Sequence, residues 1–173
     1  MKETEIKILN IDSNKIRKIL KKNNAILVKN VFQKNYAYSN NYTKEKKMVI
    51  RVRDEGKNNN KIFTVKGPRK IVKGCKVRTE HEIKVTDDAT LTKMLKMLGY
   101  KMSHYCEMKR EYYKMFNCLV EIIKFPKIPD YLEIEGDMKG INKIASILGY
   151  NKKDYYAKSI FEAYNLKKTS FKF

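Results

Sequence analysis

Apolar and polar residues alternate along most of this chain, as in strands whose two faces meet different surroundings. The alternation is clearest at 47–54, where Ile50 and Val52 share one face and Arg51 and Arg53 share the other. Short polar turns separate the alternating segments, which indicates that hairpins join most of them. Strands are predicted at 1–9, 25–38 (either bent or divided in two), 47–54, 61–67, 75–85, 101–116, 117–125 and 131–135.

Apolar residues at helical spacing interrupt this alternation and predict helices at 13–22, 88–98, 139–148 and 153–165. Asp12 and Asp87 are suited to cap the first two helices, because a carboxylate accepts hydrogen bonds from the free amides of a first turn. Gly99 and Gly149 are suited to end the second and third. The connections are predicted to be a turn at 40–41, a hairpin loop at 55–60, a mobile basic loop at 69–74 and a rigid connector at 126–129.

Strands joined by hairpins, with a few helices among them, favour an α+β fold built on an antiparallel sheet or β-barrel. The length of 173 residues fits one domain spanning 1–173. The sequence contains neither a glycine-rich phosphate loop nor the spacing of βαβ units. If the sheet closes, one face of each strand lines a lumen and the other packs under helices on the outside.

The composition restricts the cellular compartment and the kinds of partner that we expect for this protein. The formal net charge is +20, which implies an anionic partner such as nucleic acid, an anionic surface or a small polyphosphate. The three cysteines lack metal-ligand spacing, which is consistent with a reducing compartment. No apolar run reaches membrane-spanning length, so we expect a cytoplasmic protein without a membrane partner. His81 and His104 are interpreted as structural or surface residues.

Charged residues recur on one face of strand after strand. Each such strand could simply present a salt-bridged face to solvent, but together these faces could line one lumen. Carrying charges of both signs there is costly unless a ligand, a metal and water satisfy them. The residues concerned are Glu3, Glu5, Lys7, Arg51, Arg53, Lys66, Arg78, Glu80, Glu82, Arg110, Glu133 and Glu135.

These residue types suit the binding of a triphosphate together with a divalent metal. Arg51 and Arg53 could grip phosphate oxygens bidentately, with Lys7 and Lys66 acting as point charges. Glutamates, among them Glu3, offer the oxygen ligands that Mg²⁺ or Mn²⁺ takes. Phosphoryl transfer needs positioning and charge stabilisation more than covalent help from the protein.

In their order along the chain, these motifs resemble the CYTH family, the triphosphate tunnel metalloenzymes. The family includes class IV adenylyl cyclases, thiamine triphosphatases and inorganic triphosphatases. The resemblance implies an eight-stranded antiparallel β-barrel that forms a tunnel, with a phosphate-binding basic half, an acidic cluster for Mg²⁺ or Mn²⁺ and often a homodimer. The motifs are Glu3-x-Glu5-x-Lys7, Arg51-x-Arg53, Thr64-x-Lys66-Gly67, Arg78-x-Glu80-x-Glu82 and the segment from Pro126 to Gly136.

Residue roles follow from the charges and from this resemblance. Glu80 or Glu82 would hold a second metal or position water, and Lys7 would act beside them in catalysis. Two positions depart from the family pattern: Met108 stands where a lysine is usual, and Ile123 where an aspartate is common. The predicted metal ligands are Glu3, Glu5, Glu133 and Glu135, and the predicted phosphate-binding residues are Lys7, Arg51, Arg53, Lys66, Arg78 and Arg110.

The leading hypothesis is a metal-dependent phosphohydrolase acting on inorganic triphosphate, thiamine triphosphate or ATP. The alternative is a class IV adenylyl cyclase, which converts ATP to cyclic AMP and pyrophosphate in the same kind of site. A basic module that binds nucleic acid is the non-enzymatic alternative. It is disfavoured because the basic residues are interleaved with carboxylates that would repel a nucleic-acid backbone.

Overall fold

The computed structural model describes residues 2–56, 61–167 and 170–173. Most of the loop predicted at 55–60 lies outside these residues. Strands form where apolar and polar residues alternate, as predicted. They are β1 (Lys2–Ile8), β2 (Ile26–Ser39), β3 (Val49–Asp54), β4 (Lys61–Lys66), β5 (Lys70–Val72), β6 (Cys75–Val85), β7 (Lys101–Met115), β8 (Cys118–Lys124), β9 (Tyr131–Glu135) and β10 (Ser170–Phe171).

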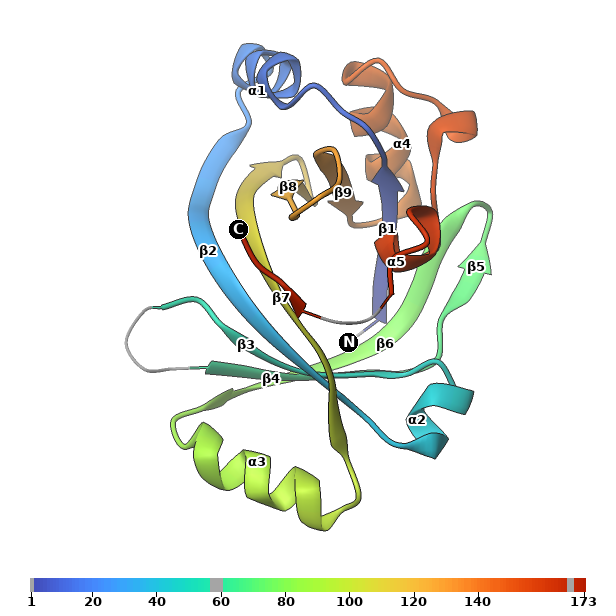
Figure 1. Cartoon of the computed structure of the whole chain (residues 1–173). Coiled ribbons are helices and arrows are strands. Elements are labelled where there is room, and N and C mark those ends of the chain that lie inside the picture. The colour runs from blue at the N-terminus through green and yellow to red at the C-terminus, as the bar shows by residue number, and fades with distance from the viewer. Residues whose placement is uncertain (1, 57–60, 168–169) are drawn as a thin grey trace.

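Eight of the strands form a closed, tunnel-like ring of antiparallel neighbours (Figure 1). Its order is β1-β9-β8-β7-β2-β3-β4-β6, and β6 pairs back with β1 to close it. Two short strands add to the ring, since β5 pairs with β6 and β10 runs parallel to β7. The prediction of an eight-stranded antiparallel tunnel in an α+β fold is confirmed. The second predicted strand proves to be one continuous strand, β2, with register shifts against β7 after Leu27 and after Ala37.

The helices are α1 (Ser13–Lys22), α2 (Asn41–Glu45), α3 (Asp88–Met97), α4 (Met138–Ile147) and α5 (Ile160–Ala163), together with a 3₁₀ turn at Lys152–Asp154. Helices α1, α3 and α4 pack against the outer surface of the ring, whereas residues of α5 line its cavity. Asp12 caps α1 and Asp87 caps α3, as predicted. No helix in the described part of the chain has both the length and the apolar character needed to cross a membrane.

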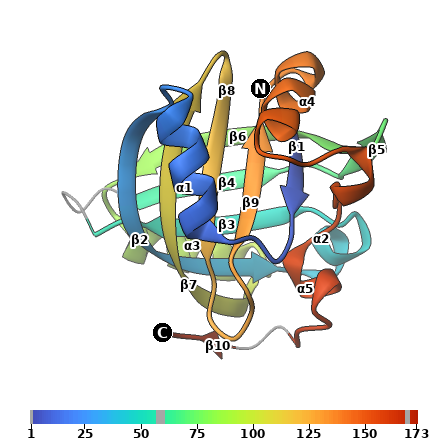
Figure 2. The ribbon, with the colours of Figure 1, turned by 90° about the horizontal axis from the view of Figure 1, so that it is seen from above.

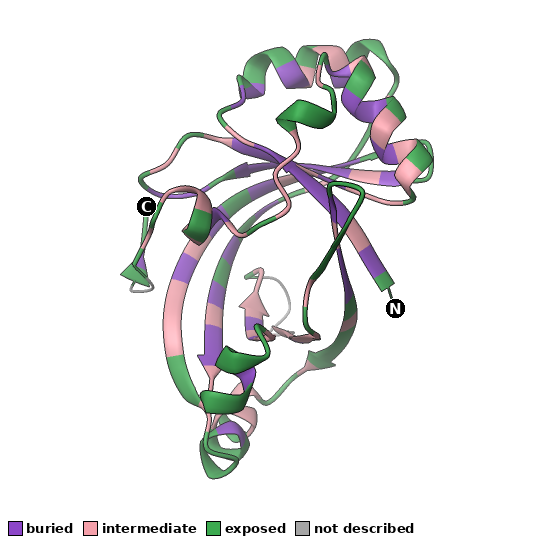
Figure 3. Ribbon diagram, turned by 90° about the vertical axis from the view of Figure 1, so that its right-hand side faces the viewer, coloured by how far each residue is buried: buried purple, intermediate pink, exposed green. Residues whose placement is uncertain are grey.

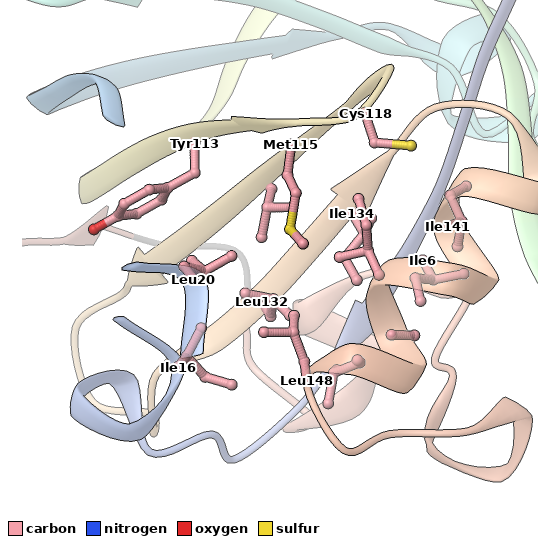
Figure 4. Close-up of a cluster of buried hydrophobic side chains, with 14 of the residues drawn as sticks. Ile6, Ile16, Leu20, Tyr113, Met115, Cys118, Leu132, Ile134, Ile141 and Leu148 are labelled. Carbon is pink, nitrogen blue, oxygen red and sulfur yellow. The ribbon is translucent and has the colours of Figure 1, made fainter. Parts of the chain in front are cut away.

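The largest apolar core lies between α1, α4 and the outward faces of β1, β7, β8 and β9. Ile6 of β1, Ile16 of α1 and Ile141 of α4 are all buried in it (Figure 4). From above, α1 and α4 lie on this side of the ring (Figure 2). Because β1 turns Ile6 and Ile8 outward, the alternate residues Glu5 and Lys7 turn toward the centre of the ring.

A second apolar core lies beneath α3, where Leu95 packs with Ile50 and Val52 of β3. Arg51 and Arg53 therefore turn into the ring. Buried positions recur along the strands, whereas the outer sides of the helices are exposed (Figure 3). The prediction that the charged faces point inward and the apolar faces lie under helices is confirmed.

Three local predictions were wrong. The segment 69–74, expected to be a loop, contains β5, because Lys70–Val72 forms a hairpin with β6. The helix expected at 153–165 is broken, since Tyr156 exchanges two backbone hydrogen bonds with Lys7 of β1 and only Ile160–Ala163 is α-helical. The turn expected at 40–41 is instead the start of α2, which Asn40 caps.

Candidate active site inside the strand ring

A cavity of about 910 Å³ lies inside the ring. Its lining comes from all eight ring strands and from the segment around α5. All the site residues predicted from the sequence line this one cavity, although their roles remain predictions. These residues are Glu3, Glu5, Lys7, Arg51, Arg53, Lys66, Arg78, Glu80, Glu82, Arg110, Glu133 and Glu135.

Carboxylates dominate the part of the wall formed by β8, β9 and β1, which we call the acidic arc. Strand register places Glu5 opposite Glu135 and Lys7 opposite Glu133. The Lys7 ammonium forms a salt bridge with Glu5 and lies 3.1 Å from Glu133. Lys7 therefore holds two carboxylates that would otherwise repel one another. The acidic arc comprises Glu3, Glu5, Glu121, Glu133 and Glu135.

The acidic arc carries more negative charge than its lysines neutralise. Burial, reinforced by the charge of Glu5, raises the pKa of Glu3 to about 8. Burial and the charge of Glu121 raise the pKa of Glu135 to about 7. Glu5 behaves differently: although burial disfavours its ionisation, Lys7 and Lys76 together hold its pKa well below the usual value. Two carboxyls here thus gain from a further cation.

Arginines dominate the facing part of the wall, on β3 and β7, which we call the basic arc: Arg51, Arg53 and Arg110. Burial first, and then the charges of Arg53 and Arg110, lower the pKa of Arg51. The Nε atoms of all three arginines are buried without a hydrogen-bond partner among the described residues. Arg110 is also bound by Glu121 of the acidic arc, at 2.6 Å. The basic arc retains donors that an anion could use.

Strands β4 and β6 carry both signs of charge between the two arcs. The Lys66 ammonium lies 2.8 Å from Glu3 and 2.9 Å from Glu80. Glu82 accepts a hydrogen bond from Thr64 at 2.7 Å and lies 3.3 Å from Arg53. Although burial opposes ionisation, Arg53 and Thr64 lower the pKa of Glu82. Glu82 is therefore a carboxylate near neutral pH.

Arg78 differs from the other predicted phosphate ligands. Its Nε and Nη2 atoms donate to the carbonyl of Gly67, at 2.9 and 2.5 Å. Gly67 has no side chain at a point where a Cβ would collide with Thr79 Oγ1, so the turn after β4 can approach β6 closely. Arg78 lines the cavity while bracing this turn.

Several cavity residues were not identified from the sequence. Glu121 escaped notice because it lies between apolar residues on both sides and shows no alternation. The Lys76 ammonium lies 2.5 Å from Glu5. Lys76 could have been identified from the sequence, because it shares one face of its strand with Arg78, Glu80 and Glu82. His81 and His104 also border the cavity; His81 is exposed, as expected of a surface residue, whereas half-buried His104 contributes to the cavity wall.

The two departures from the family pattern lie together inside the ring. Met108 and Ile123 are both buried and belong to one apolar cluster with Tyr131. Lys109, beside Met108, is exposed and points outward, so it does not replace the missing lysine. An apolar patch thus occupies the positions where a cation and a carboxylate are usual.

The acidic arc has the donors that a hard divalent cation requires. Its ligands would be carboxylate oxygens, and Glu3 Oε2 is buried without a hydrogen-bond partner among the described residues. Within the described ranges, no three His, Cys, Asp or Glu side chains yet converge on a metal-binding position. The reason is that Lys7, Lys66 and Lys76 hold Glu3, Glu5 and Glu133. The donor set fits Mg²⁺ or Mn²⁺, provided that these lysines can exchange partners.

Comparison with known proteins places this architecture. The CYTH domain model matches residues 1–158. A Methanocaldococcus jannaschii protein named as a candidate adenylate cyclase is 32% identical over 150 residues, which cover 86% of this chain and 84% of that protein.

Solved structures share the fold at lower sequence identity. The PH1012 protein of Pyrococcus horikoshii superposes with a TM-score of 0.79 at 22% identity, covering 92% of this chain and 98% of that one. HpAC1 of Hippeastrum, described as having a dominant triphosphatase activity, superposes with a TM-score of 0.68 at 13% identity, covering 94% and 95% of the two chains.

Proposed function

This chain belongs to the CYTH family, and from that premise we propose that it is a divalent-metal-dependent enzyme that hydrolyses a triphosphate inside the ring. The supporting observation is the division of one cavity inside the ring into an acidic and a basic arc. A triphosphate with a divalent cation carries both signs of charge, so each arc has a part of the ligand to bind.

The basic arc would bind the phosphate oxygens. Arg51 and Arg53 lie on β3 and Arg110 lies on β7, with β2 between the two strands, and the Nε atoms of Arg51 and Arg110 are buried without a hydrogen-bond partner among the described residues. Guanidinium groups bind phosphate bidentately, and such charge-assisted hydrogen bonds are stronger than neutral ones. A bound phosphate would also relieve the repulsion that lowers the pKa of Arg51.

Glu3, Glu5, Glu133 and Glu135 would hold the divalent cation. When bound, Mg²⁺ or Mn²⁺ supplies charge neutralisation and alignment of the leaving phosphate. Lys66 and Lys7 would move from their glutamates to the phosphate oxygens, because the triphosphate offers them a denser negative charge. These two lysines thus exchange partners between the free and the substrate-bound protein.

Glu82 would position the attacking water. It is ionised near neutral pH and held by Thr64 and Arg53 at the edge of the basic arc. A carboxylate in that state can accept a hydrogen bond from water and orient it toward phosphorus. Glu80 lies two residues away on the same face of β6 and contacts Lys66 at 2.9 Å, so it would support this arrangement.

The test is phosphate release from inorganic triphosphate, thiamine triphosphate and ATP with Mg²⁺ or Mn²⁺. Glu135→Gln should remove most of the activity while preserving the fold, because it keeps the shape of a carboxyl whose pKa is already about 7. Glu111→Gln, which changes a carboxylate bound to Arg17 of α1 outside the ring, is the matched control. Failure to hydrolyse any triphosphate with either metal would refute the proposal.

Adenylyl cyclisation is the second candidate, favoured by the Methanocaldococcus relative named for that activity. The same arcs would then bind ATP so that its ribose 3′-hydroxyl attacks the α-phosphate and pyrophosphate leaves. Incubation with ATP separates the two reactions, because cyclisation yields cyclic AMP and pyrophosphate whereas hydrolysis releases inorganic phosphate. The Glu135→Gln variant is expected to lose either activity, because both reactions would use the same divalent cation.

A further inference from the structure

The cavity extends beyond its charged arcs to an apolar end. Ala37 of β2, Cys106 and Met108 of β7, Tyr131 of β9 and Phe161 of α5 all line it. Phe161 also contacts the His104 ring edge-on, with centroids 5.0 Å apart. A bare triphosphate has no apolar surface to bury against these side chains, whereas a substrate with an organic ring does.

Asn35 of β2 lies where the apolar end meets the basic arc. Strand register places it between Arg53 on β3 and Cys106 on β7. It lines the cavity and is only 2% exposed. Neither Nδ2 nor Oδ1 of its amide has a hydrogen-bond partner among the residues that the structure describes. A buried amide with both groups unpaired is costly, so its place at the cavity wall indicates that a ligand completes it.

The chemistry of the amide narrows the ligand. A phosphate oxygen could accept from Nδ2 but would leave Oδ1 unpaired. A ring nitrogen beside an amino group presents an acceptor and a donor side by side, and asparagine pairs with such an edge through two hydrogen bonds, as it does with adenine. Aminopyrimidine and adenine rings both carry this edge and have flat apolar faces.

We propose that Asn35 is a specificity-determining residue, which binds the amino-bearing edge of an aromatic nitrogen ring joined to the triphosphate. This inference rests on the proposed function, since it assigns the organic part of that enzyme's substrate. The ring would lie against Met108 and Phe161 while the phosphates extend along Arg51 and Arg53. Met108 is unbranched and flexible, so it can shift to admit the ring to the enclosed amide.

The first experiment changes the ligand and leaves the protein intact. Affinities of β,γ-imido-ATP and of the corresponding analogue of purine riboside triphosphate, which lacks only the amino group, are measured by calorimetry with Mg²⁺. We expect the amino-bearing ligand to bind about tenfold more tightly, because the other leaves one buried amide group unpaired. Equal affinities would overturn the proposal. Because the imido group blocks cleavage between the β- and γ-phosphates, the result does not depend on hydrolytic turnover, and repeating the comparison with α,β-methylene analogues removes any contribution from cyclisation.

The second experiment changes the protein. Asn35→Leu should abolish the preference between the two ligands. Gln33→Leu is the matched control on the same strand: Gln33 is buried, its Nε2 donates to Glu55 and Tyr112, and it does not line the cavity, so its loss should leave the preference intact. A preference that survives in Asn35→Leu would refute the assignment.

A third comparison separates the two sources of such a ring. In wild-type protein, kcat/KM for ATP, thiamine triphosphate and inorganic triphosphate is measured by phosphate release. A preference for ATP assigns the edge to adenine, and a preference for thiamine triphosphate assigns it to an aminopyrimidine. A preference for inorganic triphosphate would refute the proposal about Asn35 while supporting triphosphate hydrolysis. No turnover with any of the three would instead count against hydrolysis, and the calorimetry would still test Asn35.

Discussion

The acidic and basic arcs share one cavity but manage their charges differently. In the acidic arc, lysines already hold the carboxylates: Lys7 lies between Glu5 and Glu133, and Lys66 contacts Glu3. In the basic arc, carboxylates hold only part of each guanidinium: Arg53 lies 3.3 Å from Glu82 and Arg110 lies 2.6 Å from Glu121, while the Nε atoms of Arg51 and Arg110 are buried without a hydrogen-bond partner among the described residues. Lysines thus engage the carboxylates of the acidic arc, whereas the basic arc keeps part of its donor capacity for a ligand. Substitutions in the two arcs should differ accordingly in stability and affinity.

The largest effect is expected in the acidic arc, from Lys7→Met. This change leaves Glu133 with less compensation and Glu5 with only Lys76, and breaking a buried ion pair from one side costs about 3–5 kcal/mol. The free energy of unfolding, measured with urea, should fall by that amount. Lys109→Met, which removes an exposed lysine from β7, is the control and should be nearly neutral. Equal stability of the two variants would show that Lys7 has no such structural part.

The next effect belongs to the basic arc, from Arg53→Met. Removing Arg53 relieves the repulsion that lowers the pKa of Arg51 but leaves Glu55 and Glu82 with less compensation, so we expect a smaller loss of stability than for Lys7→Met. Affinity for a hydrolysis-resistant triphosphate should fall by about 1.5–3 kcal/mol, which is the worth of a charge-assisted hydrogen bond. Calorimetry and urea unfolding of the same variant measure both quantities. A loss of stability as large as that of Lys7→Met would remove the contrast between the arcs.

The pH dependence of metal binding sharpens the description of the acidic arc. Glu3 and Glu135, with pKa values raised to about 8 and about 7, must lose protons before they can bind a cation. Affinity for Mn²⁺ should therefore rise between pH 6 and pH 8 by up to about tenfold per pH unit for each proton released. Titration with Mn²⁺ followed by electron paramagnetic resonance measures it.

The same raised pKa values have the opposite consequence for the metal-free fold. A carboxyl whose folded pKa is raised stabilises the protein below its unfolded pKa, and this contribution is lost as pH rises through the folded pKa. Without metal, the stability contributed by Glu3 should thus decline from about pH 4.5 toward about pH 8.

For metal binding, Glu135→Gln should flatten the part of the Mn²⁺-affinity profile near pH 7, because the pKa of Glu135 is about 7. A pH-independent Mn²⁺ affinity would contradict the assignment of these ligands.

The smallest effect is expected outside the ring. Arg17 of α1 pairs with Glu111 at 2.7 Å, close to the 2.6 Å that separates Arg110 from Glu121 inside the cavity. The Arg17 side chain is 31% exposed, so Arg17→Met should cost under about 1 kcal/mol in unfolding free energy. A cost comparable to that of Lys7→Met would mean that enclosure does not determine how strongly these ion pairs matter.

Period-two patterns predicted the ring and most of the site, because alternation fixes which side chains share a face. Glu5 and Lys7 could be assigned to one face because they alternate along the strand with the apolar residues Ile6 and Ile8. Glu121 could not, because neighbours on both sides are apolar and buried whichever way they point. The sequence also could not predict which ion pairs and hydrogen bonds these charged side chains form. Arg78 binds the Gly67 carbonyl only because the turn after β4 folds back onto β6.

Long-range pairing explains the main errors. The segment 153–165 has helical spacing, yet Tyr156 pairs with the backbone of Lys7 and interrupts the helix. Asn35 was not identified from the sequence, because its interest lies in the two amide groups that have no hydrogen-bond partner among the described residues. Its neighbours across the strands, Arg53 and Cys106, become adjacent only when β2 pairs with both β3 and β7. Sequence periodicity does not indicate whether a buried amide group will find a hydrogen-bond partner in the folded protein.

Strand β1 completes the ring by pairing with β6 on one side and with β9 on the other. Both partners lie far along the chain from Glu3, Glu5 and Lys7, because β6 spans Cys75–Val85 and β9 spans Tyr131–Glu135. Closing the ring around these three charges is therefore a non-local step, and we expect it to come late in folding, after β6 and β9 have formed.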